Sequence, residues 1–176
     1  IAALSSTQIG ALSSGQIAAL TTAQVAAIET TDLAGLSTAQ MRAFETADVA
    51  ALSTNQLSAL SSSQLASLSS TQVGALSTTQ VAGLSSVQIG ALTSAQIVAL
   101  STAQVAAIET ADLAGLSTTQ MRAFQTADIA AMNTTQIAAL SSVQIGALSS
   151  GQIAALTTAQ VAAIETTDLA GLSTAQ

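Results

Sequence analysis

Nine carboxylates and two guanidiniums are the side chains of this 176-residue chain with the greatest capacity for chemistry. The acids recur at a spacing of three residues, as Glu29 with Asp32, Glu45 with Asp48, Glu109 with Asp112, Glu165 with Asp168, and Asp128 with Gln125 in place of a glutamate. Paired carboxylates bind Ca²⁺ in some proteins and hydrolyse glycosidic bonds in others. However, a Ca²⁺ site needs roughly six to eight oxygen ligands, and the chain has neither an EF-hand loop nor aromatic platforms for a sugar. We therefore predict no catalytic, cofactor-binding or metal-binding residue.

The rest of the composition agrees with this prediction. The chain has no His, Cys, Lys, Trp, Tyr or Pro, and so lacks most of the bases and nucleophiles that enzymes use. Its net charge of −7 leaves no means of neutralising phosphates, on which nucleic-acid binding depends. Apolar runs of about four residues are far shorter than the roughly 20 that span a bilayer. We expect a protein that is not an enzyme, binds no nucleic acid and does not insert into membranes.

The charged residues lie within an eight-residue repeat that fills the chain. Written from Ile1 as IAALSSTQ, IGALSSGQ and IAALTTAQ, residues 1–176 form a single array of 22 octads without an insertion. Positions one and four always carry Ile, Val, Leu, Met or Phe and are the predicted core. Position three is Ala, Gly or, once, Ser67, which predicts a close approach of backbone or side chain. Position two accepts Arg and must reach water, and the variable position seven is predicted to be exposed.

The polar positions predict a helix start in every octad. Seventeen octads pair Ser, Thr or Asn at position five with Gln at position eight, which is the pattern of a capping box. Position six is Ser or Thr in all 22 octads, so it is a second candidate for the helix cap, and the sequence does not separate the two. Five octads replace the Gln by Asp and carry Glu or Gln at position five, and we interpret these acidic octads as an alternative cap.

Side-chain geometry favours short helices over the other structures. Positions one and four share a face of a helix but point to opposite faces of a strand. One continuous helix would rotate the apolar stripe by about 80° per octad, so the helix has to break in each repeat. We predict an all-α solenoid, with one helix of about six residues per octad that is too short to be stable alone. A β-solenoid is the alternative fold.

Arg42 and Arg122 are the only cations of the chain. We expect each to pair with an acid on an adjacent coil and so to fix the alignment of the coils. The segment VAAIETTDLAGLSTAQMRAFETAD recurs after 80 residues as VAAIETADLAGLSTTQMRAFQTAD and begins a third time after a further 56. Both spacings are near whole turns if a coil contains about 3.4 octads, which predicts that the acidic octads stack on one side of the solenoid.

Tracts such as ALSTAQVAAI, which ends at Ile108, resemble the repeat regions of very large bacterial surface or secreted proteins that are often labelled adhesins. The resemblance covers the whole chain and implies an extracellular or cell-surface stalk, filament or matrix protein. We therefore predict a structural rod, an excerpt of a longer repeat protein, whose partners are neighbouring repeats of the same chain or other copies in a fibre. The alternative function is a binding scaffold or adhesin surface that uses its Ser/Thr/Gln exterior or its acidic octads.

Overall fold

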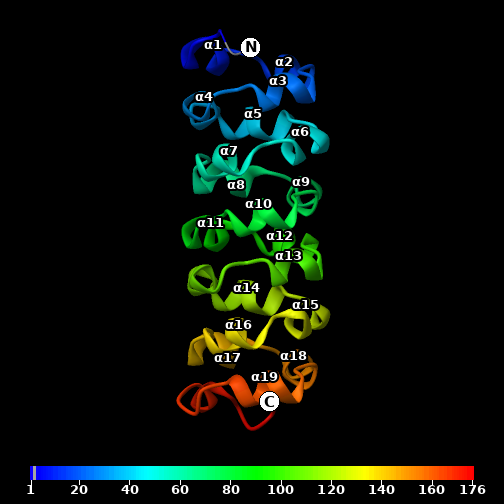
Figure 1. Ribbon diagram of the computed structural model, residues 1–176, viewed down its shortest axis with the longest axis vertical. Coiled ribbons are helices and arrows are strands. Elements are labelled where there is room, and N and C mark those ends of the chain that lie inside the picture. The colour runs from blue at the N-terminus through cyan, green and yellow to red at the C-terminus, as the bar shows by residue number, and fades with distance from the viewer. Residues whose placement is uncertain (2) are drawn as a thin grey trace.

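The computed structural model describes residue 1 and residues 3–176, and within them the chain is a column of short helical segments (Figure 1). The predicted all-α solenoid is confirmed, and the β-solenoid alternative is excluded because the described residues contain no strand. The α-helices are α1 (Ser6–Gly10), α2 (Ser14–Ala18), α3 (Thr22–Ala26), α4 (Thr30–Ala34), α5 (Thr38–Ala43), α6 (Thr46–Ala50), α7 (Thr54–Ser58), α8 (Ser62–Ser67), α9 (Ser70–Gly74), α10 (Thr78–Ala82), α11 (Ser86–Ala91), α12 (Ser94–Ala99), α13 (Thr102–Ala106), α14 (Thr118–Ala123), α15 (Thr126–Ala131), α16 (Thr134–Ala138), α17 (Ser142–Ala147), α18 (Ser150–Ala154) and α19 (Thr158–Ala163). Two segments are 3₁₀ helices, η1 (Thr110–Gly115) and η2 (Asp168–Gly171).

A typical restart of the backbone uses two extended residues, and the second of them is the N-cap. Leu92 ends α11 with φ −60° and ψ 135°, and Thr93 follows with φ −71° and ψ 158° as the N-cap of α12. The cap residue is at octad position five, so the structure decides between the two candidates in favour of position five, and position six is the first helical residue. None of the described residues needs a positive φ for this turn, which explains how the octads manage with few glycines.

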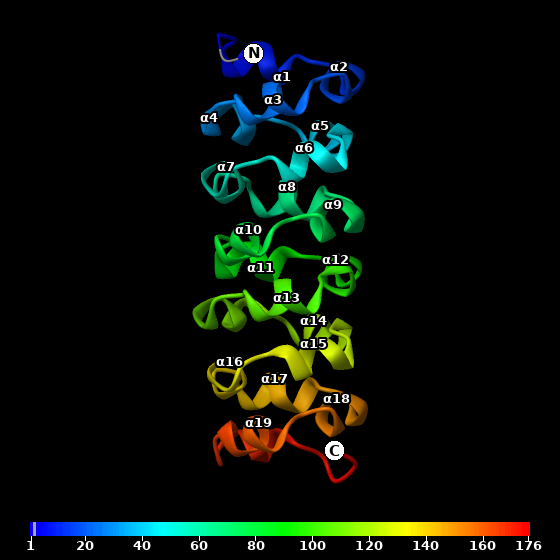
Figure 2. The same cartoon turned by 45° about the vertical axis from the view of Figure 1, so that its right-hand side comes forward.

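Successive segments wind so that each packs on the segment three places further along. The series α2, α5, α8, α11, η1, α16 and α19 illustrates this, because each member contacts the next. The coils therefore stack along the column axis, as Figure 2 shows from a second direction. Because a segment of five or six residues buries little surface by itself, the contacts between turns supply most of its stability.

The glutamines of octad position eight hold one turn to the previous one. Gln96, which is only 1% exposed, accepts the N–H of Thr93 with Oε1 at 2.7 Å. Its Nε2 donates to the carbonyl oxygens of Leu65 at 3.0 Å and Leu68 at 2.8 Å, at the end of the segment four places earlier. A carboxylate at this position would accept the cap N–H but could not donate to the carbonyls. The double role therefore explains why these octads carry Gln and not Glu.

This bridge is repeated along the column. A carbonyl 28 residues earlier accepts from Gln40, Gln56, Gln64, Gln72, Gln80, Gln88, Gln96, Gln104, Gln120, Gln136, Gln144, Gln152, Gln160 and Gln176. A segment thus packs on the segment three places back and bonds to the end of the segment four places back. One turn therefore contains between three and four octads, the interval that includes the 3.4 suggested by the spacing of the acidic octads.

The inside of the column is one continuous hydrophobic cluster. Octad positions one and four, such as Ile97 at 0% and Leu100 at 2% exposure, are buried over most of the array, as predicted. Position seven is exposed in every octad, which confirms that prediction too. Burial of each large side chain stabilises the fold by about 1.5–3 kcal/mol, and this gain is spread evenly along the column. None of the described helices combines the length and apolar character required to cross a membrane.

Candidate functional site

Two of the acidic octads, those of Asp48 and Asp128, retain the cap and lose the bridge between turns, whereas no capping box forms at α4, η1 or η2. Asp48 and Asp128, at 2% and 1% exposure, are as deeply buried as the glutamines they replace. Their Oδ2 atoms accept the N–H of Glu45 at 3.2 Å and of Gln125 at 2.9 Å. The interpretation of these octads as an alternative cap is therefore confirmed for α6 and α15. An ionised carboxylate has no proton to give to the preceding turn, so a different donor is needed there.

In one acidic octad the longer residue at position five supplies such a donor. Gln125 Nε2 donates to the carbonyl of Val98 at 3.2 Å, across to the preceding turn. The amide has moved from position eight to position five, as expected if the two positions share one space. The other acidic octads have Glu29, Glu45, Glu109 and Glu165 at this position, and a glutamate carboxylate makes no equivalent donation.

The surroundings of two of the aspartates raise their pKa above the ordinary value. Burial raises the pKa of Asp128, against the opposing hydrogen bond from Gln125 N–H. Burial, followed by the negative charge of Glu109, also raises the pKa of Asp112, while the N–H of Ser86 opposes the shift. Both shifts follow from placing a carboxylate where the repeat normally provides a hydrogen-bond donor.

The two arginines reach the adjacent coil but bond to its backbone. Arg42 Nε donates to the carbonyl of Ser67 at 3.0 Å, and Arg122 Nε donates to that of Ala147 at 3.2 Å. The partner that we predicted was an acid, so this prediction is corrected. The carbonyls at the end of a short helix are free to accept, and they lie closer to position two than the acidic side chains do. Arg42 also lines an open hollow of about 730 Å³ together with Glu45.

Close contacts between backbones explain some of the glycines at octad positions two and three. A Cβ added to Gly115 would lie 2.1 Å from the carbonyl oxygen of Ser86, and one added to Gly90 would lie 2.5 Å from that of Gly115. A second pair of coils is equally tight, since a Cβ on Gly146 would lie 2.3 Å from the oxygen of Gly171. Only glycine permits backbones to approach this closely.

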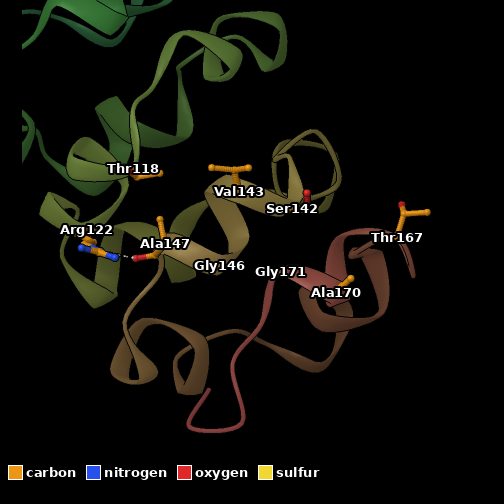
Figure 3. A pocket seen from close by; sticks show the side chains of 9 residues that line it. All are labelled: Thr118, Arg122, Ser142, Val143, Gly146, Ala147, Thr167, Ala170 and Gly171. Atoms are coloured by element: carbon orange, nitrogen blue, oxygen red, sulfur yellow. Dashed lines mark hydrogen bonds between the residues drawn. The ribbon is translucent and has the colours of Figure 1, made fainter.

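Two open pockets lie beside these glycine contacts, and we call them the first and second crease. The first crease, of about 400 Å³, is lined by Ser86, Val87, Gly90, Ala114 and Gly115. The second crease, of about 430 Å³ (Figure 3), is lined by the equivalent residues Ser142, Val143, Gly146, Ala170 and Gly171, with Thr118, Arg122, Ala147 and Thr167. Neither crease was predicted, although the sequence carries a signal for them: IGAL is followed 24 residues later by LAGL in three places.

The described residues contain no group of three or more acidic side chains that could hold a metal ion together. The structure brings Asp112 close to Glu109 and to the backbone of Ser86, and it places Asp32 against the hydroxyl of Ser6. The surface features that could take a ligand are therefore the creases rather than the pairs of acids alone.

Comparison with known protein families identifies the repeat. A model described as the ALTTAQ repeat matches residues 1–27, 25–60, 41–78, 74–102, 105–142 and 121–158. The chain belongs to the ALTTAQ repeat family. No curated protein and no solved structure matches it significantly. The ALTTAQ match supports the tandem octad organisation, and the function has to be argued from the geometry of this chain.

Proposed function

We propose that this ALTTAQ array is a structural rod, a spacer or filament segment without catalytic activity. The supporting observation is the double role of glutamines such as Gln96, which start their own segment and also hold the previous turn. Each octad bonds to carbonyls of the preceding turn and offers carbonyls of its own to the glutamine of a later turn. Such an array is lengthened by adding octads without changing the existing ones.

The surface supports a spacer better than it supports a recognition module. Position seven is exposed throughout and carries small or short polar residues in most octads, whereas binding hot spots are enriched in Trp, Tyr and Arg. We propose that the rod lies outside the cell or on its surface, in line with the resemblance to bacterial adhesin-like tracts. Its proposed partners are neighbouring repeats or further copies in a fibre, with no role for nucleic acid, membrane insertion or a cofactor.

Small-angle X-ray scattering of arrays with half, one and two times the present number of octads tests the rod. The longest dimension should increase in proportion to the number of octads, while the cross-sectional radius stays constant. A control array with the residue order scrambled within each octad should lose helical circular dichroism. Compact particles whose cross-section grows with length would overturn the proposal. Immunogold labelling of intact cells with antibody to the repeat tests the location separately.

A further inference from the structure

The two creases share one chemistry. Each combines a glycine contact between backbones, a serine from the start of a helix and an exposed valine. Val87 and Val143 are 70% and 66% exposed, and the other large hydrophobic side chains of the described residues are less exposed. Position seven elsewhere carries Thr, Ala, Gly, Asn or Ser. Each crease therefore pairs an unpartnered apolar side chain with an open pocket, which is a surface suited to a small apolar group.

Negative charge adjoins both creases. Asp112 lies against the backbone of Ser86, which lines the first crease, and Glu109 lies close to Asp112. Glu165 and Asp168 occupy the same octad positions beside the second crease. The 3₁₀ segments leave Asp112 and Asp168 partly exposed, whereas Asp48 and Asp128 are buried in α-helices. Positive charge near an acidic, partly apolar surface is favoured over negative charge.

The creases also lie on the same side of the column. α11 and α17, which carry the two valines, are on the same side in both views of the molecule (Figures 1 and 2). They are seven octads apart, which is about two turns when one turn contains between three and four octads. A partner with two suitable segments, joined by a linker of that length, would contact both creases at once.

We propose that these creases form a docking face for a cationic polypeptide segment, one in which Lys or Arg alternates with small apolar residues. The apolar side chain of the partner fills the crease beside Val87 or Val143, and its cations face the adjoining acids. A second copy of this chain is disfavoured as the occupant, because it has no Lys and the same excess of negative charge. This docking face adds to the proposed rod and does not depend on the length or location of that rod.

A difference between the two creases tests the sign of the charge on the partner. Arg122 lines the second crease, while the equivalent position at the first crease is Ala66. A cationic partner should therefore prefer the first crease. Exposed ion pairs change binding only modestly, by about two- to fivefold each. Two creases engaged by one linked partner should bind it at least about tenfold tighter than either alone.

Fluorescence anisotropy with a labelled Lys-Val alternating peptide tests the proposal on the full chain. Binding should weaken several-fold in Val87→Thr with Glu109→Gln, and Ala66→Arg should weaken it further. Arg122→Ala should strengthen binding when the first crease is blocked by Val87→Thr. The substitution Val87→Thr is compatible with the fold, because Thr7 occupies the equivalent position in the first turn, and circular dichroism verifies each variant.

Matched controls separate a local docking face from the general negative charge of the rod. Glu45→Gln removes the same charge from α6, away from both creases, and should leave peptide binding within twofold of the unchanged chain. A Glu-Val peptide should not bind, and a Lys-Ser peptide should bind several-fold more weakly than Lys-Val. Equal losses for Glu45→Gln and Glu109→Gln, or equal binding of Lys-Ser and Lys-Val, would overturn the proposal. Scattering measurements on the same variants show whether the rod itself is intact.

Discussion

Glutamine octads and the two acidic octads that cap α6 and α15 begin their helices in the same way but differ in how they hold the preceding turn. Gln96 accepts the N–H of its cap and donates to two carbonyls on the turn before it. Asp128 accepts the N–H of its cap, and only the neighbouring Gln125 donates across to Val98. The apolar core is buried equally at both places. The difference teaches that the core holds the coils together, while one amide per octad satisfies the carbonyls between them.

The largest effect is expected from removing a bridging amide. Gln96→Ala takes away the cap acceptor and leaves the carbonyls of Leu65 and Leu68 without their donor, which should cost about 2–4 kcal/mol of unfolding free energy. Gln96→Glu keeps the cap acceptor but removes the donor to the preceding turn, so it measures the bridge without the cap. Urea unfolding followed by circular dichroism measures both variants. The exposed neighbour Ala95→Ser serves as the control and should change stability by less than about 0.5 kcal/mol. A cost for Gln96→Ala no larger than that of the control would contradict the bridge.

A smaller loss is expected from closing the glycine contact at the end of η1. Gly115→Ala would place a methyl group 2.1 Å from the carbonyl oxygen of Ser86 and should destabilise the array by about 1–3 kcal/mol. Gly35 occupies the same octad position, but its added Cβ would meet nothing closer than the Asp32 oxygen at 3.4 Å. Gly35→Ala should therefore be neutral or stabilising by about 0.4–1 kcal/mol. Thermal unfolding of the two variants compares them directly, and equal losses would show that the contact is not rigid.

Converting an acidic octad into a glutamine octad should stabilise the array by a moderate amount. The double substitution Gln125→Ser with Asp128→Gln restores the usual cap and the amide donor, for a gain of about 1 kcal/mol. The single substitution Gln125→Glu removes the donation to Val98 and should cost about 0.5–1.5 kcal/mol. Urea midpoints of the two variants, measured at neutral pH, should move in opposite directions. A shift in the same direction would mean that the amide of Gln125 does not replace the bridge.

The smallest expected effect is a dependence on pH that belongs to the acidic octads alone. Because burial raises the pKa of Asp128, the folded chain holds this proton more tightly than the unfolded chain does. Its contribution to stability is therefore complete below the unfolded pKa and is lost as the pH rises through the folded pKa. The stabilisation of the Gln125→Ser, Asp128→Gln variant over the unchanged chain should grow across that window and then level off. A difference that stays constant with pH would contradict the raised pKa.

Much of this architecture was predictable because the chain contains many copies of one unit. The restriction of positions one and four to large apolar residues identified the core, and Ala or Gly at position three identified the close contact that Gly115 makes with Ser86. The cap at position five could not be chosen over position six, because both carry hydroxyls. The backbone partners of Arg42 and Arg122 were not predictable either, since a carbonyl leaves no trace in the residue type that provides it.

What the sequence does not determine is clearest where the same eight residues appear twice. Residues 29–36 and 165–172 both read ETTDLAGL, so their local preferences are equal, and the sequence predicts a restart and two core positions in each. Leu33 and Leu36 are buried as predicted, whereas Leu169 is 43% exposed. Yet the first forms the α-helix α4, with Asp32 buried against the hydroxyl of Ser6, and the second forms the 3₁₀ segment η2, with Gly171 pressed on the backbone of Ser142. Only the tertiary structure decided between them, because a helix of about five residues is too short to fix its own hydrogen-bond pattern. The neighbouring turn therefore sets its conformation.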